Sequence, residues 1–295
     1  MVIGGLQKTS LIDYPEKISA VIFTQGCNFK CHYCHNPELI QSTRKSTIDP
    51  SEVLNFLFKR KKQLDGVVIT GGEPTIQSDL SQYLSEIKSM GYSIKLDTNG
   101  SNPDIIKKLA DKKLVDYIAM DIKAPLKRYA GITQIKIDTN KIKDSISHIL
   151  QSKINHEFRT TISKAFLKAE DILGIGKLLV SLRGACHPGQ NACHPEADAE
   201  GSRAEGSCIL KSKKTRSLCS LDSSQAQNDI SGIAAFQPKA DSRNDTAFDT
   251  KYILQHFRNT NILNPAYSNA QNFSDLEISK LLTALRKHIS IVNVR

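Results

Sequence analysis

Three cysteines lie close together early in the chain, in the segment Ile22–Pro37, which reads IFTQGCNFKCHYCHNP. They are Cys27, Cys31 and Cys34, spaced C-x3-C-x2-C. An apolar run ends just before a Gln-Gly pair, so the thiols should sit on a loop that follows a buried strand. Soft thiolate ligands select iron–sulfur clusters, zinc or Cu(I). Three thiolates on a four-iron cluster would leave one iron open to a substrate.

A zinc knuckle is the alternative interpretation of the three cysteines. A structural zinc site uses four ligands, and either His32 or His35 could supply the fourth. Buried structural thiols are a poorer explanation, because the residues between the cysteines include the polar Asn28 and Lys30.

A glycine-rich turn follows the next predicted strand, Gly66–Thr70. It reads Gly71-Gly72-Glu73-Pro74. Two glycines allow the backbone to approach a ligand closely, and we expect the Glu73 carboxylate to face a cationic group. The alternative is an ordinary loop in which Glu73 caps a short helix.

Charged and hydroxyl side chains end the next two predicted strands, Ser93–Asp97 and Tyr117–Asp121. Asp97 and Thr98 follow the first, and Asp121 with Lys123 follows the second. Residues two apart on a strand share a face, so Asp121 and Lys123 should point the same way. Such a set suits a ribose, a carboxylate and a hard cation. The alternative is a buried salt bridge that closes the end of the sheet.

Two later strands offer further polar candidates. Arg159 lies in the predicted strand Glu157–Ile162 and could bind a carboxylate through its fork of donors, or simply pair with Glu157 or Asp121. In the predicted strand Tyr252–His256, strand alternation allows either Gln255 or His256, but not both, to face a ligand.

Short β-branched runs alternate with longer amphipathic stretches through most of the chain. The remaining strands are predicted at 18–24 and 289–292, and helices at 50–62, 79–90, 103–112, 141–151, 168–182 and 274–288. Alternating strands and helices imply parallel pairing, so the fold class is α/β, with a barrel or partial barrel. In such a fold functional residues gather at the carboxyl ends of the strands, which is where each motif above falls.

Residues 184–248 interrupt this alternation. They are rich in Gly, Ser, Ala, Asn and Asp, lack a sustained apolar period, and contain short internal copies such as ACHP. Such a composition buries too little apolar surface to order itself. We therefore expect one domain, formed by 1–183 and 249–295, with 184–248 as a low-complexity, disordered insertion. The alternative is a second metal site with ligands from Cys186, His187, Cys193, His194, Cys208 and Cys219.

The composition of the chain limits which compartment and which binding partners we expect for the protein. The formal net charge is +10, but the basic residues are scattered along predicted helices, so we expect no nucleic-acid partner. No apolar run approaches the length of a membrane span, and the first residues do not form a signal peptide. Reduced thiols also favour a cytoplasmic protein.

The cysteine spacing, with an aromatic residue (Tyr33) before the last cysteine, resembles the radical S-adenosylmethionine (SAM) enzymes. The continuation CHNP is similar to the activating enzymes of glycyl-radical proteins. The opening GGLQKTSLIDYPEKISAVIFTQGCNF resembles the activating enzymes of anaerobic ribonucleoside-triphosphate reductase. The match covers Met1 to about Leu182 and resumes near Lys251. It departs locally at Glu16, where the family has Gly, and at His32, where it has Pro.

This resemblance implies a radical SAM partial (β/α)6-type barrel and a set of roles. Cys27, Cys31 and Cys34 would hold a [4Fe–4S] cluster, and the Gly71–Glu73 segment would hold the amino group of SAM. Tyr33 would lie near the adenine, Lys123 would contact SAM, and a monovalent cation would bind at Asp97, Thr98 and Asp121. Arg159 and one of Gln255 and His256 complete the expected cofactor site.

The implied reaction is reductive cleavage of SAM to a 5′-deoxyadenosyl radical, which takes a hydrogen atom from a backbone glycine of a partner enzyme. The partners would be a glycyl-radical enzyme resembling anaerobic ribonucleotide reductase and an electron donor such as flavodoxin or ferredoxin. Three alternatives remain: a radical SAM enzyme acting on a small molecule or peptide, a metal-binding module without turnover, and a nearly inert homologue.

Overall fold

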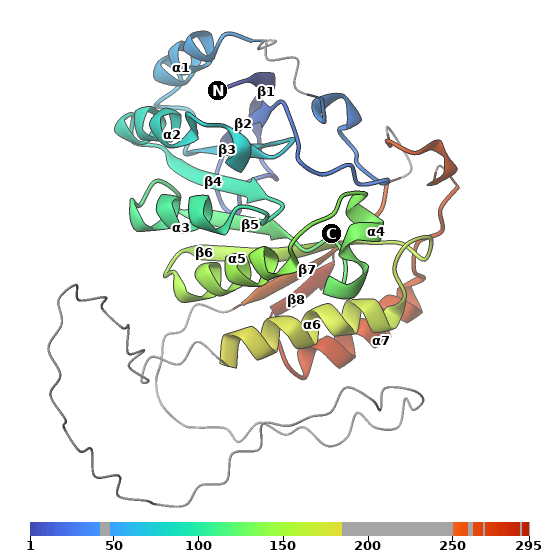
Figure 1. Ribbon diagram of the computed structural model, residues 1–295. Coiled ribbons are helices and arrows are strands. Elements are labelled where there is room, and N and C mark those ends of the chain that lie inside the picture. The colour runs from blue at the N-terminus through green and yellow to red at the C-terminus, as the bar shows by residue number, and fades with distance from the viewer. Residues whose placement is uncertain (42–47, 185–249, 259–261, 268, 290, 295) are drawn as a thin grey trace, which may run out of the picture. The chain divides into compact units, whose positions relative to one another are not determined.

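The computed structural model describes residues 1–41, 48–184, 250–258, 262–267, 269–289 and 291–294. Its centre is an eight-stranded sheet in which the strands lie in chain order (Figure 1). Strands β2 to β8 are parallel, and β1 pairs antiparallel with β2. The strands are β1 (Ile3–Ser10), β2 (Ser19–Thr24), β3 (Gly66–Gly71), β4 (Ser93–Thr98), β5 (Tyr117–Asp121), β6 (Asn155–Ile162), β7 (Lys251–His256) and β8 (Ile291–Val294).

Helices connect the parallel strands and pack against their outer face (Figure 1). They are α1 (Pro50–Lys59), α2 (Leu80–Ser89), α3 (Pro103–Asp111), α4 (Tyr129–Thr133), α5 (Thr139–Gln151), α6 (Ala169–Gly184) and α7 (Asp275–Arg286), with short 3-10 turns η1 (Pro37–Leu39), η2 (Pro74–Ile76), η3 (Leu126–Arg128) and η5 (Pro265–Tyr267). This alternation confirms the α/β partial-barrel prediction.

Each strand sends alternate side chains to two different environments. In β5, Ile118 and Met120 join the large core between sheet and helices, whereas Tyr117 and Ala119 join a small cluster on the inner face. The inner face thus carries a thin apolar layer and, further along the strands, the charged residues of the site. The helix-covered face carries most of the buried apolar surface, which dominates folding stability.

Helix starts follow the local chemistry of the sequence. The side chain of Asp49 caps α1, accepting a hydrogen bond from the Ser51 amide at 2.8 Å, with Pro50 at the first helical position. Ser274 and Glu277 form the capping box that their spacing predicts at the start of α7.

Three elements differ from the prediction. Strand β1 was not expected, because two glycines and four polar residues interrupt its apolar pattern. Helix α4 has only five residues, too few to show a helical period. Strand β8 begins two residues later than the predicted range 289–292.

Glu16 occupies the left-handed region of backbone conformation, with φ of 63°. A side chain at this conformation crowds the following carbonyl oxygen, whereas glycine adopts it freely. This conformation gives a physical reason for the glycine expected at position 16 from the family resemblance.

The described elements all belong to one unit, formed by residues 1–188 and 247–295. Gly184 ends α6 and β7 begins at Lys251. Apart from Gly184, the predicted insertion 184–248 lies outside the described residues. No helix in the described ranges is long and apolar enough to cross a membrane.

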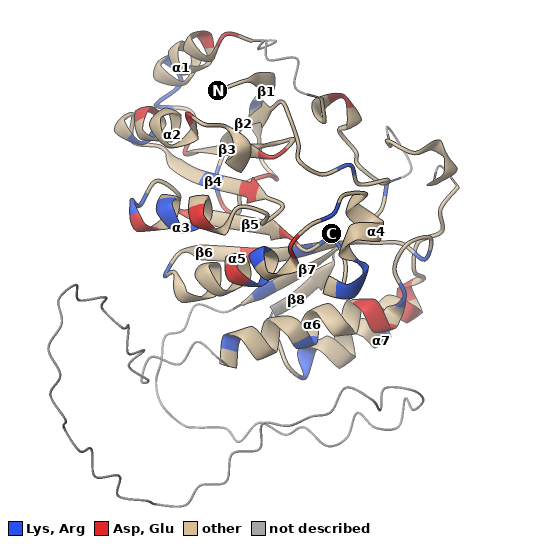
Figure 2. Ribbon diagram, viewed as in Figure 1, with Lys and Arg blue, Asp and Glu red and all other residues tan. Residues whose placement is uncertain are grey.

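Lysine and arginine positions are spread over several elements. Figure 2 shows them on α3, α5 and α6, interleaved along the chain with acidic positions. The distribution on the described helices agrees with solvated helix faces.

Candidate active site

A cavity of about 190 Å³ opens at the carboxyl ends of the parallel strands. Its walls come from the loop after β2 and from the ends of β3, β4, β5, β6 and β7. Every residue predicted for the site lines this cavity, with the exception of His256. Parallel strands bring their carboxyl ends to one edge, which explains why motifs far apart in sequence converge.

The cysteine loop is fixed by backbone hydrogen bonds at several points. The Gly26 and Cys27 amides donate to the carbonyls of Leu39 and Ile40, at 2.8 and 3.0 Å. The Lys30 amide donates to Thr133 at the end of α4, at 2.9 Å. The unpredicted helix α4 therefore supports the loop, and these anchors hold it against the mouth of the cavity.

All three thiols lie in an environment that disfavours charge. Burial raises the pKa of Cys27 to about 11 and that of Cys31 to about 12, and burial also raises the pKa of Cys34. A thiolate there needs a cationic partner, and iron or another soft metal is the partner that thiolates select. Three soft donors lining one cavity fit a [4Fe–4S] cluster, in which each thiolate binds a different iron.

The zinc-knuckle alternative receives no support from the two histidines. His35 Nε2 lies 3.0 Å from the carbonyl oxygen of Arg258, and its ring packs against Phe257. The His32 ring packs against Tyr267, with centroids 5.7 Å apart.

The two glycines after β3 are required by neighbouring backbone. A Cβ on Gly72 would lie 2.0 Å from the carbonyl oxygen of Gly26. Gly71 has φ of 111°, and a Cβ there would lie 2.4 Å from the Thr24 amide nitrogen. The Glu73 amide in turn donates to the Gly26 oxygen at 2.8 Å. Close approach to the end of β2 therefore explains Gly71, and close approach to the cysteine loop explains Gly72.

Glu73 is fully buried and accepts four hydrogen bonds. They come from the amide and hydroxyl of Thr75 (3.1 and 2.5 Å), the Thr98 hydroxyl (2.7 Å) and the Asn99 amide (2.7 Å). Burial raises its pKa, and these donors act against that rise. The side chain caps η2, as the alternative considered for this motif holds. Its four donors are neutral groups of the protein, and its contact with a cationic ligand group stays a prediction.

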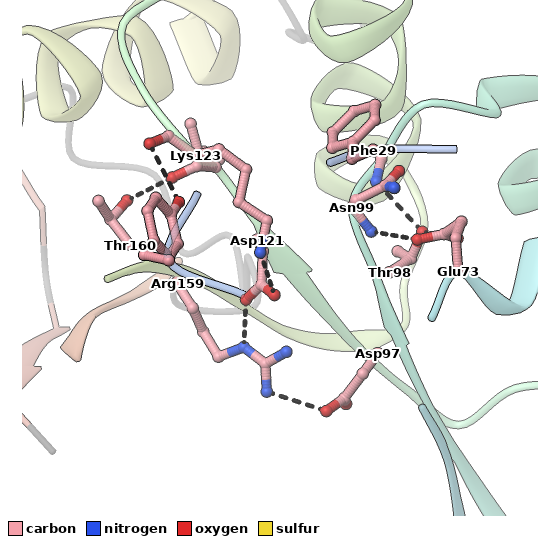
Figure 3. Close-up of polar contacts among 12 residues, drawn as sticks. Phe29, Glu73, Asp97, Thr98, Asn99, Asp121, Lys123, Arg159 and Thr160 are labelled. Atoms are coloured by element: carbon pink, nitrogen blue, oxygen red, sulfur yellow. Dashed lines mark hydrogen bonds and ion pairs between the residues drawn. The ribbon is translucent and has the colours of Figure 1, made fainter. Parts of the chain in front are cut away.

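An alternating chain of charges crosses the inner face of the sheet (Figure 3). Lys95 Nζ lies 2.5 Å from Asp97 Oδ1, and Asp97 Oδ2 lies 3.0 Å from Arg159. Arg159 Nε donates to Asp121 Oδ1 at 2.7 Å, and Asp121 Oδ2 lies 3.0 Å from Lys123 Nζ. Strand alternation points Lys95, Asp97, Asp121 and Arg159 to the same face, and Lys123, just after β5, joins them through Asp121. Arg159 is the centre of this network and is 11% exposed.

Each charge in this network is stabilised by its neighbours. Burial alone would raise the pKa of Asp121, but the attraction of Arg159 and Lys123 outweighs it and leaves that pKa well below its usual value. Arg159 and Lys95 lower the pKa of Asp97 in the same way. Burial would lower the pKa of Lys123, yet Asp121 raises it well above its usual value. Asp97, Asp121 and Lys123 are therefore charged near neutral pH.

The predicted cation ligands are already engaged with other groups. Both oxygens of Asp97 and of Asp121 contact cationic side chains, and the Thr98 hydroxyl donates to Glu73. In this arrangement the cationic partners of the two carboxylates disfavour a monovalent-cation site there. The ion-pair alternative describes their local contacts.

Aromatic rings back the cavity beside the last cysteine. Tyr33 stacks on Phe166, with centroids 4.4 Å apart and planes 16° from parallel. Phe257 meets both rings edge-on, at 6.4 Å from Tyr33 and 5.5 Å from Phe166. Stacked and edge-on contacts of this kind are favourable beyond their buried area. They fix the orientation of the Tyr33 ring at the cavity wall.

The structure selects Gln255 over His256 as the residue that faces the cavity. Gln255 pairs in register with Thr161, and both line the cavity. Tyr252 and Leu254 point to the helix-covered core, and alternation gives His256 the same face as these two.

Sequence reasoning missed several residues of the site. Lys95 was not predicted, and Glu157 was considered only as a partner of Arg159, from which its carboxylate lies 3.9 Å. Both are buried at 1% exposure, and Glu157 accepts a hydrogen bond from Tyr117 at 3.2 Å. Polar residues at inner positions of otherwise apolar strands were the signal for both. Asn28 and Asn99, whose side chains are hydrogen-bonded to each other, were also missed; Asn99 precedes Gly100, and Asn-Gly is an ordinary turn.

Comparisons with known proteins agree with this geometry. A family model described as "Radical SAM superfamily" matches residues 21–165. The chain is 38% identical over 184 residues to "Putative glycyl-radical enzyme activating enzyme MJ1227" of Methanocaldococcus jannaschii, covering 59% of this chain and 74% of the relative. It is 34% identical over 116 residues to a Staphylococcus aureus "Pyruvate formate-lyase-activating enzyme", of which it covers 45%.

Among solved structures, Streptococcus suis SuiB bound to S-adenosylmethionine matches with a TM-score of 0.55 and 12% identity. The match covers 93% of this chain and 48% of SuiB. At that identity the likeness concerns the fold alone.

The chain therefore belongs to the radical SAM superfamily. Within that superfamily it is an enzyme similar to the glycyl-radical activating enzymes. Membership implies a [4Fe–4S] cluster and SAM as cofactors, which the three thiols and the cavity beside them fit.

Proposed function

We propose that this enzyme installs a glycyl radical on a partner protein, and that the partner resembles anaerobic ribonucleotide reductase. The observation that carries the proposal is the convergence of three thiols and the charged strand ends on one cavity. The similarity to proteins named as glycyl-radical activating enzymes supports the substrate class. The close match of the first residues to one branch of those enzymes supports the particular partner.

The residues of the chain take distinct roles in this proposal. Cys27, Cys31 and Cys34 hold the cluster, and the Gly71–Glu73 turn receives the amino end of SAM. When bound, the cluster and SAM supply reductive cleavage to methionine and a 5′-deoxyadenosyl radical, which removes a hydrogen atom from the substrate.

Lys123 lies within reach of the cavity, and only one hydrogen bond of its ammonium group, to Asp121, is seen in the described part of the chain. We propose that it donates to an anionic or hydroxyl group of SAM. Arg159 and Gln255 face the same space and would contribute further donors. The proposal does not extend to a monovalent cation, because Arg159 and the two lysines already neutralise Asp97 and Asp121.

The electron for this reaction would come from a flavodoxin- or ferredoxin-like donor. Free thiol ligands and a reduced cluster require a reducing compartment, so the proposal places the enzyme in the cytoplasm.

The test uses anaerobically reconstituted full-length enzyme, dithionite, SAM and two purified candidate partners: an anaerobic ribonucleotide reductase and a pyruvate formate-lyase. Each partner is produced with glycine deuterated at Cα. We expect a glycyl-radical EPR signal on the reductase and deuterium in the recovered 5′-deoxyadenosine. The Cys31→Ala variant, which lacks one cluster ligand, is the matched control and should give neither.

Each outcome of this test separates the candidate functions. A radical on the lyase alone would keep the activating function and change the partner. Cleavage of SAM with no deuterium transfer from either protein would favour a small-molecule or peptide substrate. No cleavage of SAM by an iron-loaded enzyme would contradict the proposal.

A further inference from the structure

Three polar side chains form a closed ring of hydrogen bonds beside the cysteine loop. Asn99 Nδ2 donates to Asn28 Oδ1 at 2.9 Å, and Asn28 Nδ2 donates to Ser101 Oγ at 2.8 Å. The Ser101 amide donates to Asn99 Oδ1 at 2.9 Å, which completes the ring. Asn99 and Ser101 are almost fully buried. Both ends of both amides are therefore used within the ring.

The ring is continuous with the buried carboxylate of the glycine-rich turn. The backbone amide of Asn99 donates to Glu73 Oε2 at 2.7 Å, and Figure 3 shows Asn99, Thr98 and Glu73 grouped together. One network thus joins the cysteine loop through Asn28, the end of β4 through Asn99, and the Gly71–Glu73 turn through Glu73.

Asn28 lies between the residues whose backbone amides anchor the cysteine loop. The anchors described above act at Gly26, Cys27 and Lys30. Between Cys27 and Lys30 the Asn28 side chain ties the loop to the sheet edge. Phe29, the next residue, packs edge-on against Tyr129 at 6.4 Å. Motion of this segment would change the distance between Cys27, Cys31 and the glycine-rich turn.

We propose that Asn28, Asn99 and Ser101 are positioning residues that hold the Cys27–Cys31 segment in register with the Gly71–Glu73 turn. Their side chains act through the ligating cysteines and not by contact with the cluster. This inference rests on the radical SAM site and not on the identity of the partner. A failure of the glycyl-radical test would leave it standing.

Two variants of Asn28 separate the hydrogen bonds from the side-chain shape. Asn28→Leu keeps a similar volume and removes both bonds. Asn28→Asp can keep both, because one carboxylate oxygen accepts from Asn99 and the hydroxyl of Ser101 can turn to donate to the other. A second pair, Ser101→Ala and Ser101→Thr, removes or keeps the hydroxyl without adding charge near the cluster. This second pair also provides the test if Asn28→Leu does not fold.

The experiment measures the rate of iron release from the holoenzyme to a chelator under anaerobic conditions. The loss of two hydrogen bonds should speed release by roughly 5- to 150-fold in Asn28→Leu, and by less in Ser101→Ala. Asn28→Asp and Ser101→Thr should release iron near the wild-type rate. The EPR spectrum of the reduced cluster should respond to SAM in the wild type and in the two conservative variants, and respond less in Asn28→Leu.

The thermal midpoint of each variant distinguishes positioning from general stability. We expect Asn28→Leu to release iron fast and to have a thermal unfolding midpoint close to that of Asn28→Asp. Wild-type release in Asn28→Leu or Ser101→Ala would overturn the proposal. Equally fast release from Asn28→Asp and Asn28→Leu, or release that only follows the fall in midpoint across all four variants, would also overturn it.

Discussion

Arg159 should be the most sensitive single position in the charged network. We consider Arg159→Met, which keeps much of the aliphatic stem and removes the guanidinium. The change takes a cation from between two carboxylates, since Arg159 contacts Asp97 at 3.0 Å and Asp121 at 2.7 Å. The side chains of these three residues are 11–26% exposed, so water screens the loss only partly.

The expected loss of stability depends on the cationic partners that each carboxylate keeps after the substitution. Removal of one partner of a buried ion pair costs about 3–5 kcal/mol. Here Asp97 keeps Lys95 and Asp121 keeps Lys123, so the low end of that range, about 3 kcal/mol, is expected near pH 7. The matched control is Lys107→Met, which breaks an exposed helical pair with Asp111 and should cost less than about 1 kcal/mol.

The pH dependence gives a second check. Both aspartates have folded pKa values below their unfolded values of about 4. Their stabilisation is therefore present above that pH and is lost as the pH falls through the folded pKa values. Without Arg159 the folded values rise. The difference in the free energy of unfolding between variant and wild type should then narrow as the pH falls from 7 to about 3.5.

Urea unfolding of protein prepared without iron, followed by circular dichroism at 222 nm, measures this difference without a contribution from cluster loss. The reasoning is refuted if Arg159→Met is no less stable than Lys107→Met at pH 7. It is also refuted if the difference between Arg159→Met and wild type stays constant over the whole pH range.

Three further predictions concern other parts of the molecule. Lys123→Ala should keep its iron but bind SAM roughly 10- to 150-fold more weakly in anaerobic calorimetry, through loss of a charged donor; unchanged affinity would remove this residue from the SAM site. Glu16→Gly should raise the free energy of unfolding by roughly 0.5–1 kcal/mol, because glycine relieves the left-handed backbone at some entropic cost; a lower urea midpoint would contradict this. Excision of 184–248, with a short Gly-Ser join between Arg183 and Asp249, should leave iron content and SAM cleavage intact, because the three cysteines and every strand-end motif lie outside it; iron loss beyond one cluster would indicate a second metal centre.

The parts of the fold that the sequence predicted well are those with a strong period or a defined cap. Tyr117–Asp121 is a strand with the predicted bounds, and the capping box at Ser274 begins α7 as expected. Strand β1 was not predicted because it is an edge strand and glycines interrupt its apolar pattern. Helix α4 was not predicted because it is too short to show a helical period. It is held by tertiary contacts, among them the hydrogen bond from the Lys30 amide to the Thr133 carbonyl.

The candidate site was predictable in its membership but not in its contacts. Motifs at strand ends fix which residues line the cavity, because parallel strands share one edge. Partner choice inside the cavity depends on three-dimensional distances, which local patterns do not encode. Arg159 pairs with Asp97 from a strand that is not its neighbour, and Glu73 accepts a hydrogen bond from Asn99, 26 residues later in the chain.

The position of the crossover between β6 and β7 has a consequence for how the protein can be assembled. Strand β7 pairs with β6 over six residue pairs, although the connection between them contains 184–248. The cysteines, the glycine-rich turn and the charged network all precede this connection, whereas Gln255 follows it. The chain is thus divided into a fragment that carries the three cysteines and a fragment that closes the side of the cavity at β7. A natural break at this connection would leave two polypeptides whose shared strand pair is the basis for reassociation, so the fold is suited to fragment complementation at this point.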